Sequence, residues 1–300
     1  MSLRRSLSLL LVLGLLATAC GGADEAGDIA TTDPGGDASE TADSDTAEAS
    51  CAVGDLPLVA EGTLTVATGE PVFEPWMVDD DPTNGEGFES AVVYALAEQM
   101  GFATEDVEWV RTGFDEAIGP GEKDYDFNIQ QYSITDERDQ VVDFSQPYYV
   151  SEQAIIAAEG SDIAGATSVG ELTTYRLGAA IGTTSLNYIE DVIQPDAPAQ
   201  VYNDNAAAKA AFDAGQVDGI LFDLPTAFFI TAVEITDATI VGVLPRTEGE
   251  ADELGMLFAE GSELVPCVDE ALAALEADGA LDELETRWLQ FEGEIPTLDG

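Results

Sequence analysis

Short apolar runs alternate with longer amphipathic stretches along most of the chain after Cys51. The runs have the length and β-branched content of strands, and we predict strands at 62–68, 125–129, 153–158, 176–181 and 219–223. The stretches between them show helical spacing, and we predict helices at 90–100, after 185, at 206–214 and from 264 to 288. Strands that alternate with helices predict an α/β fold with largely parallel sheets.

The helix expected after residue 185 illustrates the spacing. Leu186, Ile189, Val192 and Ile193 recur three or four positions apart, which places them on one face of a helix. We therefore expect all four side chains to face the core.

The first twenty residues have the layout of a secretory signal peptide. Arg4 and Arg5 precede an apolar run at 7–16, and the small residues of 17–19 lead to Cys20. The run has about half of the ~20 residues that a membrane-spanning helix needs. Residues 17–19 fit an ordinary cleavage site, but a cysteine directly after small residues resembles a bacterial lipoprotein box. We favour a signal peptide at 1–19 and a lipid on Cys20.

Residues 20–51 are dominated by small and acidic residues, with Ile29 as a lone large aliphatic. Such a segment buries too little apolar surface to offset its ordering entropy, so we expect a disordered, self-repelling linker. The lipid anchor and this linker would tether a folded body to a membrane. About 250 residues remain, which exceeds the usual size of one core and predicts two domains.

The chain carries 60 acidic and 9 basic residues, a formal net charge of −51. Phosphate backbones and anionic lipid surfaces repel such a body, which argues against nucleic-acid binding. The sequence has no histidine. Together with the spacing of its cysteines, this gives no reason to expect a metal, and no cofactor motif is present.

The three cysteines require an account. If Cys20 is lipidated, Cys51 and Cys267 remain as a pair in an oxidising compartment, which favours a disulfide. Two buried free thiols are the alternative.

Several polar residues follow predicted strands and are candidates for binding. Arg138, with Ser133 nearby, has the fork geometry that clamps a carboxylate, and an exposed arginine paired to Asp136 or Asp139 is the alternative. Thr183 and Thr184 come directly before a helix, where they form an anion seat or simply cap the helix.

Two further candidates have similar alternatives. Phe73 and Trp76 follow the first strand and either wall a ligand pocket or pack in the core. Asp223 ends a strand where open α/β sheets place ligand contacts, and it is equally suited to cap the helix that follows.

The order of these residues resembles the type 2 periplasmic binding proteins, in particular the polar amino acid-binding branch (bacterial extracellular solute-binding proteins, family 3). The similar motifs, spread over about 55–292, are Gly87-Phe88-Glu89, Asp126-Phe127-Asn128-Ile129, Ser133-Ile134-Thr135, Arg138, Asp143-Phe144-Ser145, Pro147-Tyr148, Gly182-Thr183-Thr184, Gly215-Gln216-Val217-Asp218 and Ala277–Leu281 with Trp288.

The resemblance implies roles for particular residues. It implies that Arg138, Ser133, Thr183 and Thr184 hold a ligand carboxylate and that Asp223 accepts the ligand ammonium. It implies further contacts from Phe73, Trp76 and Glu70, the last with the ligand side chain. The sequence departs from the family pattern where Gln131 and Tyr132 replace a glycine and a small or apolar residue, and where Glu89 replaces an aspartate. Gln131 either selects ligand side chains or blocks part of the pocket.

The same resemblance implies two lobes joined by two crossover strands, with the ligand in the cleft between them. We expect one lobe from 52–149 and 249–300 and the other from 150–248, with crossovers near 149–151 and between 245 and 254. The implied function is the substrate-binding component of an ABC importer for a small zwitterion, acting as a monomer beside a permease and its ATPase. Two other functions stay open, an enzyme related to cyclohexadienyl dehydratases and a receptor-coupled sensor.

Overall fold

A computed structural model describes residues 50–246, 252–291 and 293–300. The chain divides into a unit at Met1–Ala47 and a second at Glu48–Gly300, and the second holds every element below. The expected signal peptide, Cys20 and the linker up to residue 49 lie outside the described residues. Within the described ranges, no helix has the length and apolar character needed to cross a membrane.

The first sheet has five strands in the order β2–β1–β3–β12–β4. Their bounds are β1 Leu64–Gly69, β2 Val107–Thr112, β3 Phe127–Asn128, β4 Val142–Phe144 and β12 Leu257–Ala259. Strand β1 runs parallel to β2 and β3, whereas β12 is antiparallel to β3 and β4. All six residues of β1 are buried, as expected for a central strand covered on both faces.

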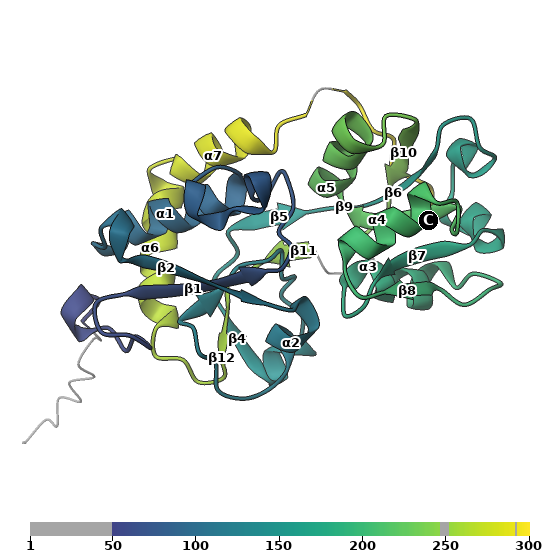
Figure 1. Ribbon diagram of the computed structural model, residues 1–300. Helices are drawn as coiled ribbons and strands as arrows, with labels where there is room; N and C mark the ends of the chain where they lie inside the picture. The colour runs from purple at the N-terminus through teal and green to yellow at the C-terminus, as the bar shows by residue number, and fades with distance from the viewer. Residues whose placement is uncertain (1–49, 247–251, 292) are drawn as a thin grey trace, which may run out of the picture. The chain divides into compact units, whose positions relative to one another are not determined.

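Helices cover both faces of this sheet. Figure 1 shows α1 (Phe88–Met100), α6 (Val265–Ala277) and α7 (Ala280–Trp288) grouped together beside β1 and β2. The apolar faces of α1 and α6 pack on β1 in one core cluster. A smaller cluster, around Tyr132, holds the short helix α2 (Phe114–Ile118).

The second sheet has the order β10–β6–β9–β7–β8. Its strands are β6 Gln153–Ala158, β7 Leu177–Ala180, β8 Gln200–Tyr202, β9 Gly219–Asp223 and β10 Ala238–Val243. Strand β7 is parallel to β8 and β9, and β6 is antiparallel to β9 and β10.

Alternate residues of β6 face opposite layers of helices, because successive side chains of a strand point to opposite faces. Ile155 packs in the cluster that contains α3 (Thr184–Asn187) and the π-helical turn that continues it. Ile156 packs in the cluster that contains α4 (Asn205–Asp213) and α5 (Leu224–Phe229). This sheet is therefore the middle layer of the second lobe.

Two short strands link the sheets. Strand β5 (Tyr149–Ser151) connects β4 of the first sheet to β6 of the second, and β11 (Asp252–Leu254) precedes β12 of the first. The two pair antiparallel, with Asp252 opposite Ser151. The architecture is two α/β lobes with two crossover strands, as the sequence predicts.

The C-terminal residues return to the second sheet. Thr297 forms a bridge with Val243 of β10, and Asp299 forms one with Ser168. Leu298 is buried in the same cluster as Ile155. The end of the chain thus packs with the second lobe, although α6 and α7 pack with the first.

Cys51 and Cys267 form a disulfide, as the sequence analysis favours, with Cα atoms 5.4 Å apart. Cys267 is buried in α6, and Cys51 lies two residues before the short 3-10 turn Val53–Asp55. The bond joins positions 216 residues apart and fixes the start of the described chain to the first lobe.

Candidate ligand-binding site

A cavity of about 170 Å³ lies between the lobes and beside the crossover strands. Its described lining from the first lobe is Glu70, Pro71, Phe73, Thr112, Gly113, Phe114, Gln130, Gln131, Ser133 and Arg138. Ser151, Gln153 and Leu254 line it at or next to the crossovers. The second lobe contributes Ala180, Ile181, Thr183, Thr184, Ser185, Asn203, Asp204, Asn205, Phe222 and Asp223. Eight of the nine predicted ligand contacts are among these residues.

Arg138 enters the cavity from a short 3-10 turn after β3. Its guanidinium donates to the carbonyl oxygen of Ser133 at 2.5 Å and to that of Gly182 at 2.8 Å, so it contacts both lobes. The Phe114 ring lies 5.6 Å from the guanidinium carbon. Burial lowers the pKa of Arg138, but a guanidinium stays charged in proteins. Among the described residues, Arg138 forms no ion pair, so its charge is available to a bound anion.

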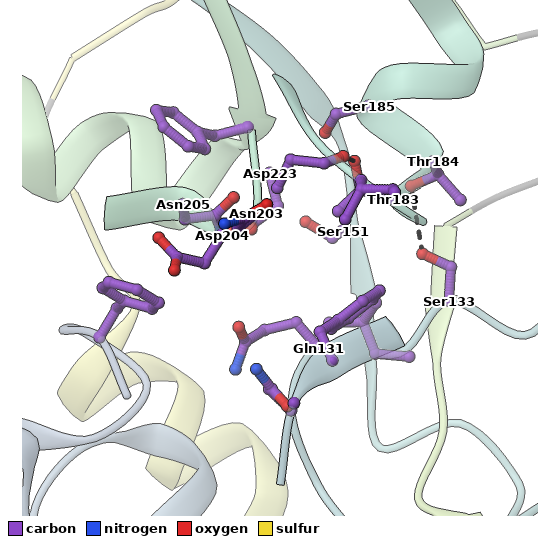
Figure 2. A pocket seen from close by; sticks show the side chains of 18 of the residues that line it. Gln131, Ser133, Ser151, Thr183, Thr184, Ser185, Asn203, Asp204, Asn205 and Asp223 are labelled. Carbon is purple, nitrogen blue, oxygen red and sulfur yellow. Dashed lines mark hydrogen bonds between the residues drawn. The ribbon is translucent and has the colours of Figure 1, made fainter. Parts of the chain in front are cut away.

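Hydroxyl groups lie close to this arginine. The Ser133 and Thr184 hydroxyl oxygens are 3.4 Å apart, one from each lobe (Figure 2). Thr183 is the N-cap of α3, and its hydroxyl accepts from the Leu186 amide at 3.2 Å. The capping role considered for Thr183 is therefore real, and Thr184 offers the hydroxyl that meets the first lobe.

Asp223 ends β9 and caps α5, so both roles considered for it coincide. Its carboxylate accepts from the Thr226 amide at 3.2 Å and from the Thr226 hydroxyl at 2.9 Å. The residue is only partly buried, but its surroundings withdraw the carboxylate from water, and this burial raises the pKa of Asp223 to about 6. No lysine or arginine of the described ranges pairs with it, and a bound ammonium would favour its charged form.

The two aromatic candidates have different positions. Phe73 lines the cavity, whereas Trp76 is fully buried and is not among the described lining residues. The indole N–H of Trp76 donates to the Thr226 hydroxyl at 2.8 Å, and its ring packs edge-on against Phe88 and Tyr149. Trp76 thus supports Asp223 through Thr226 and does not form a wall of the pocket.

Gln131 lines the cavity from an unusual backbone position, with a φ of 50°. Its amide N–H donates to Glu89 Oε1 at 2.8 Å, and its side-chain Nε2 donates to Glu89 Oε2 at 2.5 Å. Glu89 is fully buried in α1, and it also accepts from the Tyr148 hydroxyl at 2.5 Å. Burial raises the pKa of Glu89 to about 7.

The sequence analysis missed several polar lining residues, among them three consecutive ones on the second lobe. Figure 2 shows Asn203, Asp204 and Asn205 grouped near Asp223, on the side of the cavity away from Ser133 and Thr184. Asp204 also caps α4, where it accepts from the Ala207 amide at 2.7 Å. These residues follow β8, and the rule that singled out Asp223 at the end of β9 would have found them.

The charges of the lining are unequal. Glu70, Asp204 and Asp223 contribute carboxylates, and Arg138 is the one cationic residue of the described lining. Such a cavity can hold a carboxylate at Arg138 and an ammonium at Asp223, with two carboxylates left for the rest of the ligand.

Residues 64–291 match the family of bacterial extracellular solute-binding proteins, family 3, and the chain belongs to that family. The L-cystine-binding protein TcyJ of Escherichia coli is 27% identical over 232 residues, which are 76% of this chain and 82% of that protein.

Two solved structures are similar across the same part of the chain. An ancestral arginine-binding protein bound to arginine has a TM-score of 0.64 and 28% identity, covering 76% of this chain and 99% of the other. An ancestral amino acid-binding protein described as a precursor of cyclohexadienyl dehydratase has a TM-score of 0.63 and 27% identity, covering 76% and 96%. The fold is that of the type 2 periplasmic binding proteins.

Proposed function

We propose that the chain is the extracytoplasmic substrate-binding component of an ABC importer and that its ligand is an amino acid. The carrying observation is that Arg138 and Asp223 line one cavity from opposite lobes. A zwitterion is the simplest ligand that satisfies both charges, because its carboxylate meets the guanidinium and its ammonium meets the aspartate.

Ligand binding would favour the closed arrangement of the lobes. A ligand that contacts both lobes stabilises the state in which both contacts exist, by the difference in its affinity for the two states. Closure around the ligand is then the signal that a permease reads. Ser133, Thr183 and Thr184 would support the carboxylate, and Phe73 would cover the ligand.

The other charged residues that line the cavity favour a ligand with a neutral or cationic side chain over a ligand with an acidic one. Glu70 and Asp204 add two carboxylates that the backbone of an amino acid does not neutralise. A ligand with an acidic side chain would place a like charge beside them. One similar structure is an ancestral arginine-binding protein bound to arginine, an amino acid with a cationic side chain.

Export and membrane attachment complete the proposal. A signal peptide at 1–19, a lipid on Cys20 and an acidic linker to residue 51 would tether the body at the outer face of the cytoplasmic membrane. The binding protein would work as a monomer beside a permease and its ATPase. We assign 52–149 and most of the C-terminal part to lobe 1, and 150–248 to lobe 2 together with the tail that bridges to β10.

An enzymatic function on the same scaffold is the second candidate. Burial raises the pKa of Asp223 to about 6, which is suitable for a general acid, and one similar structure is a precursor of cyclohexadienyl dehydratase. Incubating the purified protein with prephenate and arogenate separates the two functions, because a binding protein leaves both unchanged.

The direct test is a thermal-shift screen of the purified protein against the twenty L-amino acids, L-ornithine, opines and polyamines. We expect the melting temperature to rise with at least one amino acid, because a ligand that binds only the folded state stabilises it by mass action. No shift with any amino acid would contradict the proposal.

A further inference from the structure

Glu89 holds three hydrogen-bond donors although it lies on no surface of the cavity. Its two carboxylate oxygens accept from the backbone N–H of Gln131, from Nε2 of the same residue and from the Tyr148 hydroxyl. The side chain is fully buried, and no lysine or arginine of the described ranges pairs with it. A buried carboxylate that accepts all of these hydrogen bonds holds the residues that donate to it in one arrangement.

The region that it fixes is part of the cavity wall. Gln131 has a φ of 50°, in the left-handed region that disfavours most side chains. Both polar ends of this residue, backbone and side chain, are bound to one carboxylate, so its rotamer is set by Glu89. Since one N–H of Nε2 is committed to Glu89, the acceptor Oε1 and the second N–H of Nε2 are left for other contacts.

We propose that Glu89 is a positioning residue that holds Gln131 in the pocket, and that Gln131 is the residue that limits which amino-acid side chains the pocket admits. This inference rests on the proposed function of the same site. It accounts for two departures from the family pattern. Glu89 is one methylene longer than the usual aspartate, Gln131 has a side chain where a glycine is usual, and the two side chains form one hydrogen bond. Tyr148, which precedes β5, connects the same carboxylate to a crossover strand.

The contact between Glu89 and Gln131 should make the selectivity for ligand side chains depend on pH. Protonation of Glu89 adds a hydrogen to one of the two oxygens that accept these donors and weakens the contact at that oxygen, and burial raises the pKa of Glu89 to about 7. The titratable groups that face it are Tyr148, Tyr132 and Asp223. Burial raises the pKa of both phenols, so they stay protonated in the neutral range. Asp223 titrates in this range, but it meets the ammonium that all amino acids share.

The test compares two amino acids that differ in side-chain size, so that changes at the shared ammonium and carboxylate cancel. L-ornithine and L-arginine are the expected pair, and otherwise the two best binders of unequal size from the screen replace them. Calorimetry gives the ratio of their Kd values for the wild type, for Gln131→Gly and for Gln131→Asn. Glycine and asparagine both tolerate a positive φ, so the backbone conformation at position 131 is preserved. Neither has a side chain long enough to reach Glu89 Oε2 as glutamine does.

We expect both variants to shift the ratio toward the larger amino acid by about tenfold or more, the scale at which pockets discriminate a few side-chain atoms. Glu89→Gln should shift the ratio in the same direction in the wild-type background and leave it unchanged in Gln131→Gly. The exposed Glu98 of the same helix supplies the control Glu98→Gln, which should behave as wild type.

A pH series distinguishes positioning from a merely structural role. Between pH 8 and pH 6 the wild-type ratio should move toward that of Gln131→Gly, whereas Glu89→Gln should show a constant ratio. An unchanged ratio in Gln131→Gly and Gln131→Asn overturns the inference and leaves the proposed function intact. If no amino acid binds the wild type at all, the proposed function fails as well.

Discussion

The indole N–H of Trp76 donates to the Thr226 hydroxyl at 2.8 Å, and that hydroxyl donates to Asp223 at 2.9 Å. Trp76 follows β1 of the first lobe, and Thr226 lies in α5 of the second. The contact therefore connects the lobes directly behind the carboxylate that we assign to the ligand ammonium.

Trp76→Phe should weaken ligand binding even though Trp76 does not line the cavity. The substitution keeps most of the ring packing but removes the N–H that orients Thr226, and one such hydrogen bond contributes ~1 kcal/mol, or about a fivefold change in Kd. Trp109→Phe is the matched control, because Trp109 donates to Tyr94 at 3.2 Å on the far strand β2. Calorimetry on both variants checks the expectation, and equal Kd values for the two would refute it.

Removing the disulfide should lower the free energy of unfolding and leave ligand affinity unchanged. The bond between Cys51 and Cys267 closes a loop of 216 residues, for which the chain-entropy description gives about 5 kcal/mol as an upper figure. Neither cysteine lines the cavity. Urea denaturation of the protein with and without a reductant measures the change. Identical midpoints, with reduction verified by mass spectrometry, would be inconsistent with this expectation.

Stability should rise as the pH falls from 8 to 5. Burial raises the pKa of Glu89 to about 7 and that of Asp223 to about 6, so the folded state binds more protons than the unfolded state between about pH 4 and pH 7. The free energy of unfolding then decreases as the pH increases through this window.

Replacing one of these acids isolates its contribution, since the other carboxylates titrate in both proteins. Glu89→Gln should reduce the difference in unfolding free energy between pH 5 and pH 8 by about 2 kcal/mol. Urea denaturation at the two pH values gives this difference. The same pH dependence in wild type and variant would show that Glu89 titrates normally.

Cys20→Ser should release the protein from membranes without altering its ligand affinity. A lipid provides the membrane affinity in our proposal, and the linker separates it from the pocket. Membrane fractionation of cells that express each form measures the release. A wild-type protein that is fully soluble and begins at an unmodified Cys20 would show that the signal is an ordinary one.

Much of the fold follows from local pattern. The strands predicted at 153–158 and 219–223 have those bounds in the structure, because they are apolar runs buried on both faces. Strand β2 (Val107–Thr112) was not predicted, since its residues are mostly half-buried and include charged side chains. Its place at the edge of the sheet explains this mixed pattern.

The helix after residue 185 shows a limit of helical spacing. Leu186, Ile189 and Ile193 are buried as predicted, but Val192 is 37% exposed, and the expectation for that residue was wrong. The segment Tyr188–Ile193 is π-helical, so its residues turn through a smaller angle per step than the 3.6-residue period assumes. The sequence contains no signal for that change of period.

In the candidate site, too, some residues can be selected from local patterns and others cannot. Arg138 follows a strand and Asp223 ends one, so rules about strand ends and the family resemblance suffice to select them. The buried position of Trp76 depends on contacts with Phe88, Tyr149 and Thr226, which come from three separate segments. The partnership of Glu89 with Gln131 joins residues 42 positions apart, and no local pattern predicts it.

The central claim is that Arg138 and Asp223 hold the two charges of one zwitterion. Titration calorimetry on wild type, Arg138→Ala, Arg138→Lys and Asp223→Ala with the best ligand of the screen tests it most directly. Each truncation leaves an opposite charge buried without a partner, and we expect losses of ~2–5 kcal/mol, or about 30- to several-thousand-fold in Kd. Arg138→Lys should also lose heavily, because an ammonium cannot make a two-pronged contact. Wild-type affinity in Asp223→Ala would contradict the account and exclude Asp223 as the ammonium partner.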